Sequence, residues 1–320
     1  MKVSTMVNII LAIIIVLLIA FGWYYLRGKN PLDTVQSAVG GTVPNPKYLF
    51  TIYGPGQTPF KAPLSTYVFD NKIYVADTDN SRIMIYDYNG KYLSQFGKKT
   101  GTPGSMAAPA AVMVLNNEIY VVDIAQAIVI VYDMQGKYKR ILGNLQFIKP
   151  VSIAYANERY YILDTGAMGV NILDKNGKLI KFFGKQGDKP GEFYCPDGLD
   201  VRDNKLYVAD SNNNRIQVFD LDGKFLQEWK GKDASGAGGY SIPRGIAFDR
   251  QGNLYTAEML SGRVSITDAK GVNLSAFSYA EPPEGEIEDS MLVPTSTFID
   301  SGNRLYVTEM GNSRILVYNI

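Results

Sequence analysis

The stretch Val-Ala-Asp-Ser-Asn-Asn-Asn-Arg-Ile-Gln-Val-Phe-Asp at residues 208–220 decides the fold. It reads as a short apolar strand that closes on an acid, a polar loop, and a second strand that opens with arginine. Almost the same string, Val-Ala-Asp-Thr-Asp-Asn-Ser-Arg-Ile-Met-Ile-Tyr-Asp, stands at residues 75–87. A string this specific that occurs twice indicates a chain built from repeated units.

Six segments share the larger pattern to which this string belongs. Each begins at a proline, runs through two strands to an acid, passes through a third strand and ends near an aromatic residue and glycine. The acids lie 41 to 51 residues apart. Four short strands in such a period are typical of a β-propeller blade, so the sequence predicts an all-β, six-bladed β-propeller. The prolines are Pro63, Pro109, Pro150, Pro196, Pro243 and Pro294, and the acids are Asp77, Asp123, Asp164, Asp210, Glu258 and Glu309.

The two ends of the repeat predict how the ring closes. The sixth unit stops at Ile320, after its third strand, and a spare strand from Lys47 to Tyr53 precedes the first unit. We expect this strand to complete the sixth blade, because a closed ring leaves no sheet edge unpaired. Within the blades, pairs such as Asn89-Gly90 stand where a two-residue hairpin needs positive φ.

The repeated string resembles the NHL repeat. The Pro-x-Gly-(Leu/Ile) openings at residues 196–199 and 243–246 add to the match, which covers about residues 47–320 and is weakest in blades 2 and 3. The resemblance implies a six-bladed propeller of the NHL type. Proteins of this family include RNA-binding propellers, extracellular sensor domains of membrane kinases and a peptide-amidating lyase, so the fold does not fix the function.

Residues 1–30 are predicted to form a membrane anchor. The twenty residues from Val7 to Leu26 contain one strongly polar side chain, Asn8, and a helix of that length spans roughly 30 Å, the thickness of a hydrocarbon core. A cleaved signal peptide is the alternative, but the apolar stretch is longer than a usual signal core and no small-residue cleavage site follows it. Residues 31–46, rich in proline and glycine, are predicted to be a flexible linker to the propeller at 47–320.

The basic residues on the two sides of this single-pass anchor are nearly balanced, so charge hardly favours either orientation. Lys2 lies on one side of the apolar stretch, and Arg27 and Lys29 lie on the other. Because a six-residue leading segment is easily left in the cytoplasm, we expect the propeller to lie outside the cytoplasm.

Composition excludes several classes of chemistry. The chain of 320 residues has no histidine and one cysteine, Cys195, which excludes Ser-His-Asp and Cys-His catalysis, histidine-ligated metals and intramolecular disulfides. We expect Cys195 to be a half-buried structural thiol. Residues 31–320 carry 29 basic and 31 acidic side chains. A body with a net charge of −2 argues against a nucleic-acid partner, which needs a concentrated basic surface.

A polar motif of acid, asparagine and arginine recurs at Asp77, Asn80 and Arg82 and in blades 4 and 6. It is either a ring of ligand-binding groups or a network that stabilises each blade, and its repetition favours the network. Blades 2 and 3 break the motif with apolar loops. These loops either form an exposed patch for a partner or fold down and bury each other. Their candidate residues are Ile124, Ala127, Ile128, Phe147 and Met168.

The inter-blade loops contribute the other candidates for an interaction face. Asp197 and Arg244 stand where blades 1 to 3 have apolar residues, at the predicted mouth of the central channel. They form either an ion pair with each other or a clamp for a small polar ligand. Phe193 and Tyr240 lie in neighbouring loops. The acidic loop 278–293 binds Ca²⁺ or a cationic partner, or is simply solvated.

The sequence therefore predicts a non-catalytic, membrane-tethered binding or scaffold module for a protein, peptide or glycan partner. The alternative is a lyase- or lactonase-like propeller enzyme that uses carboxylates and Ca²⁺. No cofactor is expected other than such a Ca²⁺ ion. Its candidate ligands are Asp197, Asp210 and Glu258.

Overall fold

The computed structural model describes residues 46–320, apart from 57, 98–102, 144–146 and 281–288. The predicted anchor at 1–30, nearly all of the linker at 31–46 and most of the acidic loop lie outside the described residues. The described part of the chain contains no helix that is long and apolar enough to cross a membrane.

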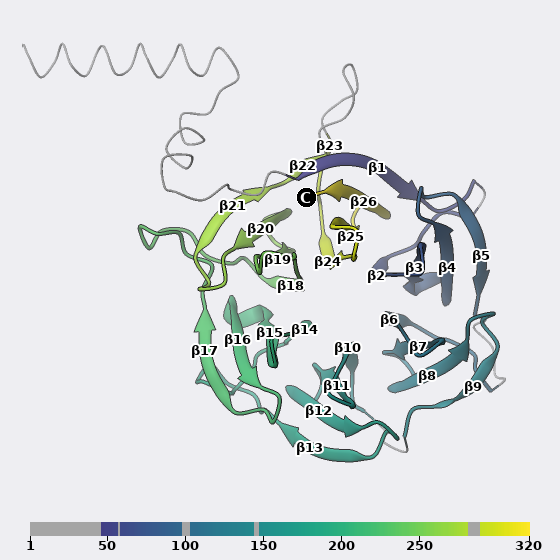
Figure 1. Cartoon of the computed structure of the whole chain (residues 1–320), viewed down its shortest axis with the longest axis horizontal. Helices are drawn as coiled ribbons and strands as arrows, with labels where there is room; N and C mark the ends of the chain where they lie inside the picture. The colour runs from purple at the N-terminus through teal and green to yellow at the C-terminus, as the bar shows by residue number, and fades with distance from the viewer. Residues whose placement is uncertain (1–45, 57, 98–102, 144–146, 281–288) are drawn as a thin grey trace, which may run out of the picture. The chain divides into compact units, whose positions relative to one another are not determined.

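Six antiparallel sheets of four strands surround a central axis (Figure 1), as predicted. Blade 1 contains β2 (Pro63–Phe69), β3 (Lys72–Asp77), β4 (Arg82–Asp87) and β5 (Tyr92–Phe96). Blade 2 contains β6 (Pro109–Leu115), β7 (Glu118–Asp123), β8 (Ile128–Asp133) and β9 (Tyr138–Ile141). Blade 3 contains β10 (Pro150–Ala156), β11 (Arg159–Asp164), β12 (Gly169–Asp174) and β13 (Leu179–Phe183).

The second half of the ring continues the pattern. Blade 4 contains β14 (Gly198–Arg202), β15 (Lys205–Asp210), β16 (Arg215–Asp220) and β17 (Phe225–Trp229). Blade 5 contains β18 (Pro243–Phe248), β19 (Leu254–Glu258), β20 (Arg263–Thr267) and β21 (Asn273–Phe277). Blade 6 contains β24 (Pro294–Ile299), β25 (Arg304–Glu309), β26 (Arg314–Asn319) and β1 (Lys47–Tyr53). Short elements are η1 (Thr78–Asn80), η2 (Ser211–Asn213), β22 (Tyr279–Ala280) and β23 (Asp289–Ser290).

Strand β1 closes the ring, which confirms the prediction. It pairs antiparallel with β26, from Lys47 opposite Asn319 to Tyr53 opposite Arg314. Blade 1 and blade 6 also meet where the hydroxyl of Thr66, on the inner strand β2, lies 2.9 Å from the hydroxyl of Thr308 on β25. The first and last segments of the propeller are therefore held together by main-chain and side-chain hydrogen bonds.

The repeat pattern predicted most strand ends. All six acids close the second strand of their blade, and five of the six prolines open the inner strand. Pro196 is the exception. The ladder of blade 4 begins where Asp197 N–H donates to Ala209 O at 3.1 Å, so β14 starts at Gly198.

The hairpin turns differ from the prediction. Four such pairs were predicted, and their glycines have φ between +77° and +82°, but no residue before them has positive φ; the glycines are Gly90, Gly136, Gly177 and Gly223. In blade 1, Gly90 N–H donates to Asp87 O, Asp87 N–H donates to Lys91 O, and the Asp87 side chain accepts from two further N–H groups. The loop is thus a three-residue type I turn with a glycine bulge, held by the aspartate, rather than a two-residue hairpin.

Candidate functional site

In the blades that carry it, the repeated polar motif is a network that ties a loop to its blade. The Asp77 carboxylate is fully buried and accepts from Arg82 Nε at 2.6 Å, from Asn80 Nδ2 at 2.9 Å and from the backbone N–H of Lys61 at 2.7 Å. Blades 4 and 6 repeat these contacts around Asp210 and Glu309. These carboxylates hold the inter-blade loops to the blades, as the stabilising interpretation requires.

In every blade the buried acid binds the N–H of the residue two places before the proline. The loops between blades and the loops between second and third strands therefore share one face of the ring, which we call the loop face. The six anchored residues are Lys61, Ala107, Ile148, Tyr194, Ser241 and Leu292.

Large apolar side chains are exposed on the loop face of blades 3 to 6. Three come from the anchored positions, since Ile148, Tyr194 and Leu292 expose 68%, 45% and 57% of their surface. The loop between β19 and β20 adds Leu260, which is 71% exposed. Backbone contact between that loop and the Leu292 loop is close, because a Cβ at Gly262 would lie 2.4 Å from Met291 O. We call these four side chains the apolar loop set.

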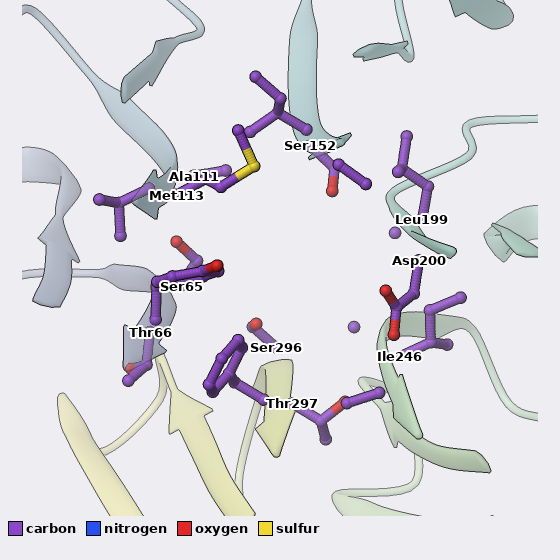
Figure 2. Close-up of a pocket in the computed structure, with 18 of the residues that line it drawn as sticks. Ser65, Thr66, Ala111, Met113, Ser152, Leu199, Asp200, Ile246, Ser296 and Thr297 are labelled. Carbon is purple, nitrogen blue, oxygen red and sulfur yellow. The ribbon is translucent and has the colours of Figure 1, made fainter. Parts of the chain in front are cut away.

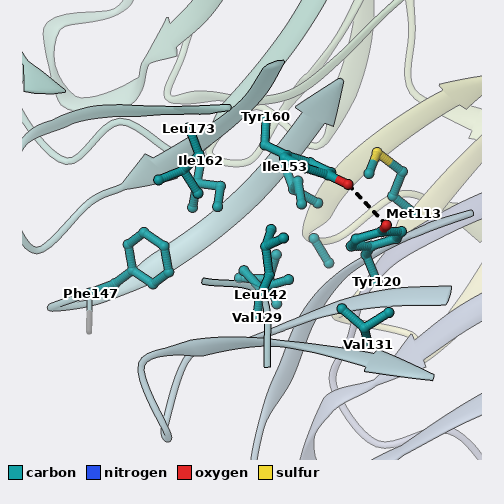
Figure 3. Packing of buried hydrophobic residues seen from close by; sticks show 12 residues of the cluster. Met113, Tyr120, Val129, Val131, Leu142, Phe147, Ile153, Tyr160, Ile162 and Leu173 are labelled. Atoms are coloured by element: carbon teal, nitrogen blue, oxygen red, sulfur yellow. Dashed lines mark hydrogen bonds between the residues drawn. The ribbon is translucent and has the colours of Figure 1, made fainter. Parts of the chain in front are cut away.

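The predicted apolar patch of blades 2 and 3 is mostly core. Phe147 is buried between these blades (Figure 3). Ile128 and Met168 are half-buried against neighbouring clusters. The loops thus fold down and bury each other. In blade 2 the missing Asn and Arg are replaced by Gln126, whose amide donates to Asp123 at 2.9 Å. Ile124 and Ala127 keep part of their surface exposed.

Two other predicted face residues are also core residues, which corrects the prediction. Phe193 is fully buried and its ring contacts the rings of Phe183 and Phe219. Tyr240 is buried with its hydroxyl 3.0 Å from Thr267 Oγ1. Aromatic side chains in these loops fill the wedge between adjacent blades. Cys195 is half-buried, as expected.

The channel mouth is built as predicted. The residue after each proline lines a small cavity of about 80 Å³ together with Ile124 and Lys149. Arg244 Nε donates to Asp197 Oδ2 at 2.9 Å, so these two residues form the predicted ion pair, with about a fifth of each side chain exposed. The six residues are Leu64, Ala110, Val151, Asp197, Arg244 and Thr295.

Behind the mouth, the inner strands enclose a cavity of about 340 Å³ (Figure 2). Small residues two places after each proline allow the blades to approach the axis. At Gly198 and Gly245 the backbone of the next blade lies too close for any side chain. An added Cβ would lie 2.0 Å from Arg244 O at Gly198 and 2.2 Å from Ser296 Cα at Gly245. The hydroxyl groups of Ser65, Ser152 and Ser296 come from the same positions in blades 1, 3 and 6.

Asp200 is the functional candidate that sequence reasoning missed. Its carboxylate points into the cavity (Figure 2) and accepts a hydrogen bond from Val201 N–H at 2.7 Å. Burial raises the pKa of Asp200 to about 7, and the Val201 N–H and the Arg202 charge lower it by less. The sequence contained a signal for this residue, because strand alternation points its position inward and Asp200 is the only charged residue among the six equivalent positions. The other five are Tyr67, Met113, Ala154, Ala247 and Phe298.

The calcium candidates are not brought together. Asp197 is paired with Arg244, Asp210 is held in its own blade, and Glu258 Oε2 accepts from Ser241 N–H and Arg263. Across the described residues, no three acidic or cysteine side chains lie close enough together to hold a metal ion. Of the acidic loop, residues 281–288 lie outside this description.

Known proteins resemble the chain in both sequence and fold. Human NHL repeat-containing protein 3 is 26% identical over 204 residues, 55% of this chain and 51% of that protein. Protein brain tumor of Drosophila melanogaster is 28% identical over 136 residues, 41% of this chain and 12% of that protein. The chain thus spans about half the length, or less, of these curated relatives.

Solved structures share the architecture at low identity. Virginiamycin B lyase from Staphylococcus aureus superposes with a TM-score of 0.56 at 18% identity, over 81% of this chain and 85% of that chain. A luciferin-regenerating enzyme reaches 0.63 at 13% identity, over 86% and 96%. At these identities the likeness shows the fold alone. The sequence model of the 6-bladed beta-propeller family matches residues 58–148 and 143–284, more than half of the chain. The chain therefore belongs to the 6-bladed beta-propeller family.

Proposed function

We propose that the chain is a non-catalytic binding module, tethered to the membrane by its N-terminal segment, that holds a protein partner on the loop face. The observation that carries this proposal is the apolar loop set, four large exposed side chains on the loop face of blades 3 to 6. Exposed apolar groups with a polar surround are typical of partner surfaces.

A protein partner fits these side chains better than a glycan. Three of the four are aliphatic, and Tyr194 is the sole aromatic member of the set, whereas sugars are held by aromatic faces together with polar groups. The Asp197–Arg244 pair at the nearby mouth provides a partly exposed polar contact that could fix the partner's register. The apolar composition of residues 7–26 supports the tether, and the proposed location of the propeller is outside the cytoplasm.

The enzyme alternative has less support. Its three carboxylate candidates are each paired separately within the described structure, and the sequence offers no histidine as a base. A binding role needs only the exposed surface and the rigid ring beneath it.

The test is affinity capture from cross-linked membranes with the full chain. A double variant, Ile148→Asp with Leu292→Asp, places two charges in the apolar loop set at positions where the backbone is held by buried acids. The matched control is Ile180→Asp, an exposed apolar residue on the outer strand β13.

We expect the double variant to lose the proteins that wild type and the control both retain. Equal recovery by all three would contradict the loop face as the binding surface. A recovered glycan in place of a protein would contradict the proposed partner class. Protease protection of the propeller in intact cells would contradict its location outside the cytoplasm.

A further inference from the structure

The central cavity has an unbalanced charge. Its lining contains two carboxylates, Asp197 and Asp200, and no basic side chain. Asp197 is neutralised by Arg244 at the mouth. Asp200 has no ion-pair partner among the described residues. A carboxylate taken out of bulk water favours a cation beside it.

The nearest basic side chain on the same strand, Arg202, is hydrogen-bonded to blade 5 and does not pair with Asp200. The Arg202 guanidinium donates to the backbone carbonyls of Asp249 and Arg250 and lies 5.4 Å from the Phe248 ring centre. It therefore joins the far side of blade 4 to blade 5. Its charge lowers the pKa of Asp200, but by less than burial raises it. The titratable and charged groups around Asp200 are Tyr67 on β2, Tyr155 on β10, Asp197, Arg202 and Tyr207.

The rest of the lining adds oxygen acceptors and an aromatic wall. The hydroxyls of Ser152 and Ser296 face the cavity with Asp200 (Figure 2), whereas Ser65 Oγ is buried in the wall without a hydrogen-bond partner. The rings of Tyr67 and Phe298 lie 4.7 Å apart on the wall. Burial, with a smaller contribution from the Asp200 charge, raises the pKa of Tyr67, so the two groups interact across the cavity.

We propose that the central cavity binds a small organic cation with a primary ammonium group, which pairs with Asp200 and donates to the serine hydroxyls. An ammonium has three N–H donors and no acceptor, and this matches one carboxylate among hydroxyl oxygens. The carbon skeleton of the ligand lies against the Tyr67 and Phe298 rings. A cavity of about 340 Å³ accommodates one such molecule. Ca²⁺ needs six to eight oxygen ligands, and a single free carboxylate does not supply that set.

This site is separate from the loop face, so the two proposals fail independently. The test is isothermal titration calorimetry on the full chain in detergent, with benzylamine as the probe and benzyl alcohol and CaCl₂ as the comparison ligands. Asp200→Asn keeps the shape and removes the charge. Asp222→Asn is the matched control, because Asp222 is an exposed acid in the turn of the same blade.

We expect benzylamine to bind wild type and Asp222→Asn alike and Asp200→Asn at least tenfold more weakly, with benzyl alcohol similarly weak. Only the ionised carboxylate pairs with the ammonium. Since the pKa of Asp200 is about 7, the affinity of wild type should fall about 90-fold between pH 8 and pH 5.

A second variant keeps the proposal testable if the first alters folding. Ala154→Leu fills the cavity from blade 3 at the level of Asp200 and should abolish binding while it retains the carboxylate. Equal binding of benzylamine by wild type and Asp200→Asn, equal binding of the alcohol, or binding of Ca²⁺ in place of the amine would each overturn the proposal.

Discussion

Replacement of Asp200 by asparagine should stabilise the empty propeller, and the gain should grow with pH. In the folded protein burial raises the pKa of Asp200 from 3.8 to about 7. Between these two values the unfolded chain has released a proton that the folded chain retains, so this group lowers the stability of wild type as pH rises. Asparagine resembles the protonated acid and has no such dependence.

The magnitude follows from the two pKa values. Each pH unit between them changes the free energy of unfolding by about 1.4 kcal/mol, so the gain from Asp200→Asn should reach about 4 kcal/mol at pH 8 and about 1.6 kcal/mol at pH 5. Because water reaches the half-buried carboxylate, both free-energy values are upper bounds.

The assay is urea denaturation of wild type, Asp200→Asn and Asp222→Asn at pH 5 and pH 8, without amine. The exposed control should match wild type at both pH values. If Asp200→Asn is as stable as wild type at pH 8, or if its gain is the same at both pH values, burial does not desolvate the Asp200 carboxylate.

Two further substitutions and one truncation test the stability of the propeller that carries these sites. Arg215→Met leaves the buried Asp210 carboxylate without its guanidinium, which also binds Lys189 O and Glu192 O, so thermal melting should report a loss of about 3–5 kcal/mol. Gly198→Ala forces a Cβ against Arg244 O and should lower stability by about 1–3 kcal/mol or more in the same assay. Removal of residues 1–53 uncovers the β26 edge that β1 covers and should cause aggregation in size-exclusion chromatography, whereas removal of residues 1–45 should leave a monodisperse propeller.

Features fixed by a repeated local string were predictable from the sequence. The six acids that close the second strands and the closing strand β1 follow from spacing alone, because each blade must bury the same faces. The Asp197–Arg244 pair followed as well, since both residues interrupt an otherwise apolar position at the mouth.

Features that depend on a neighbouring blade were not predictable in the same way. Phe193 and Tyr240 stand in loops, where sequence alone suggested exposure, but each fills a wedge formed by two blades. The turn type depended on Asp87, whose side chain holds the loop through two N–H groups. Asp200 was missed because the Pro196-x-Gly198 opening identifies the inner strand of blade 4 but does not show which of its later side chains face the channel. That information comes from the alternation of the strand.

The most direct test of the binding-module proposal is photo-cross-linking from a single site in living cells. A photoreactive amino acid in place of Tyr194 stands within the apolar loop set, and the same amino acid in place of Ile180 stands on the outer strand of blade 3. We predict a discrete cross-linked protein from position 194 and none from position 180. Cross-links of equal yield from both positions, or none from position 194, would contradict a partner on the loop face.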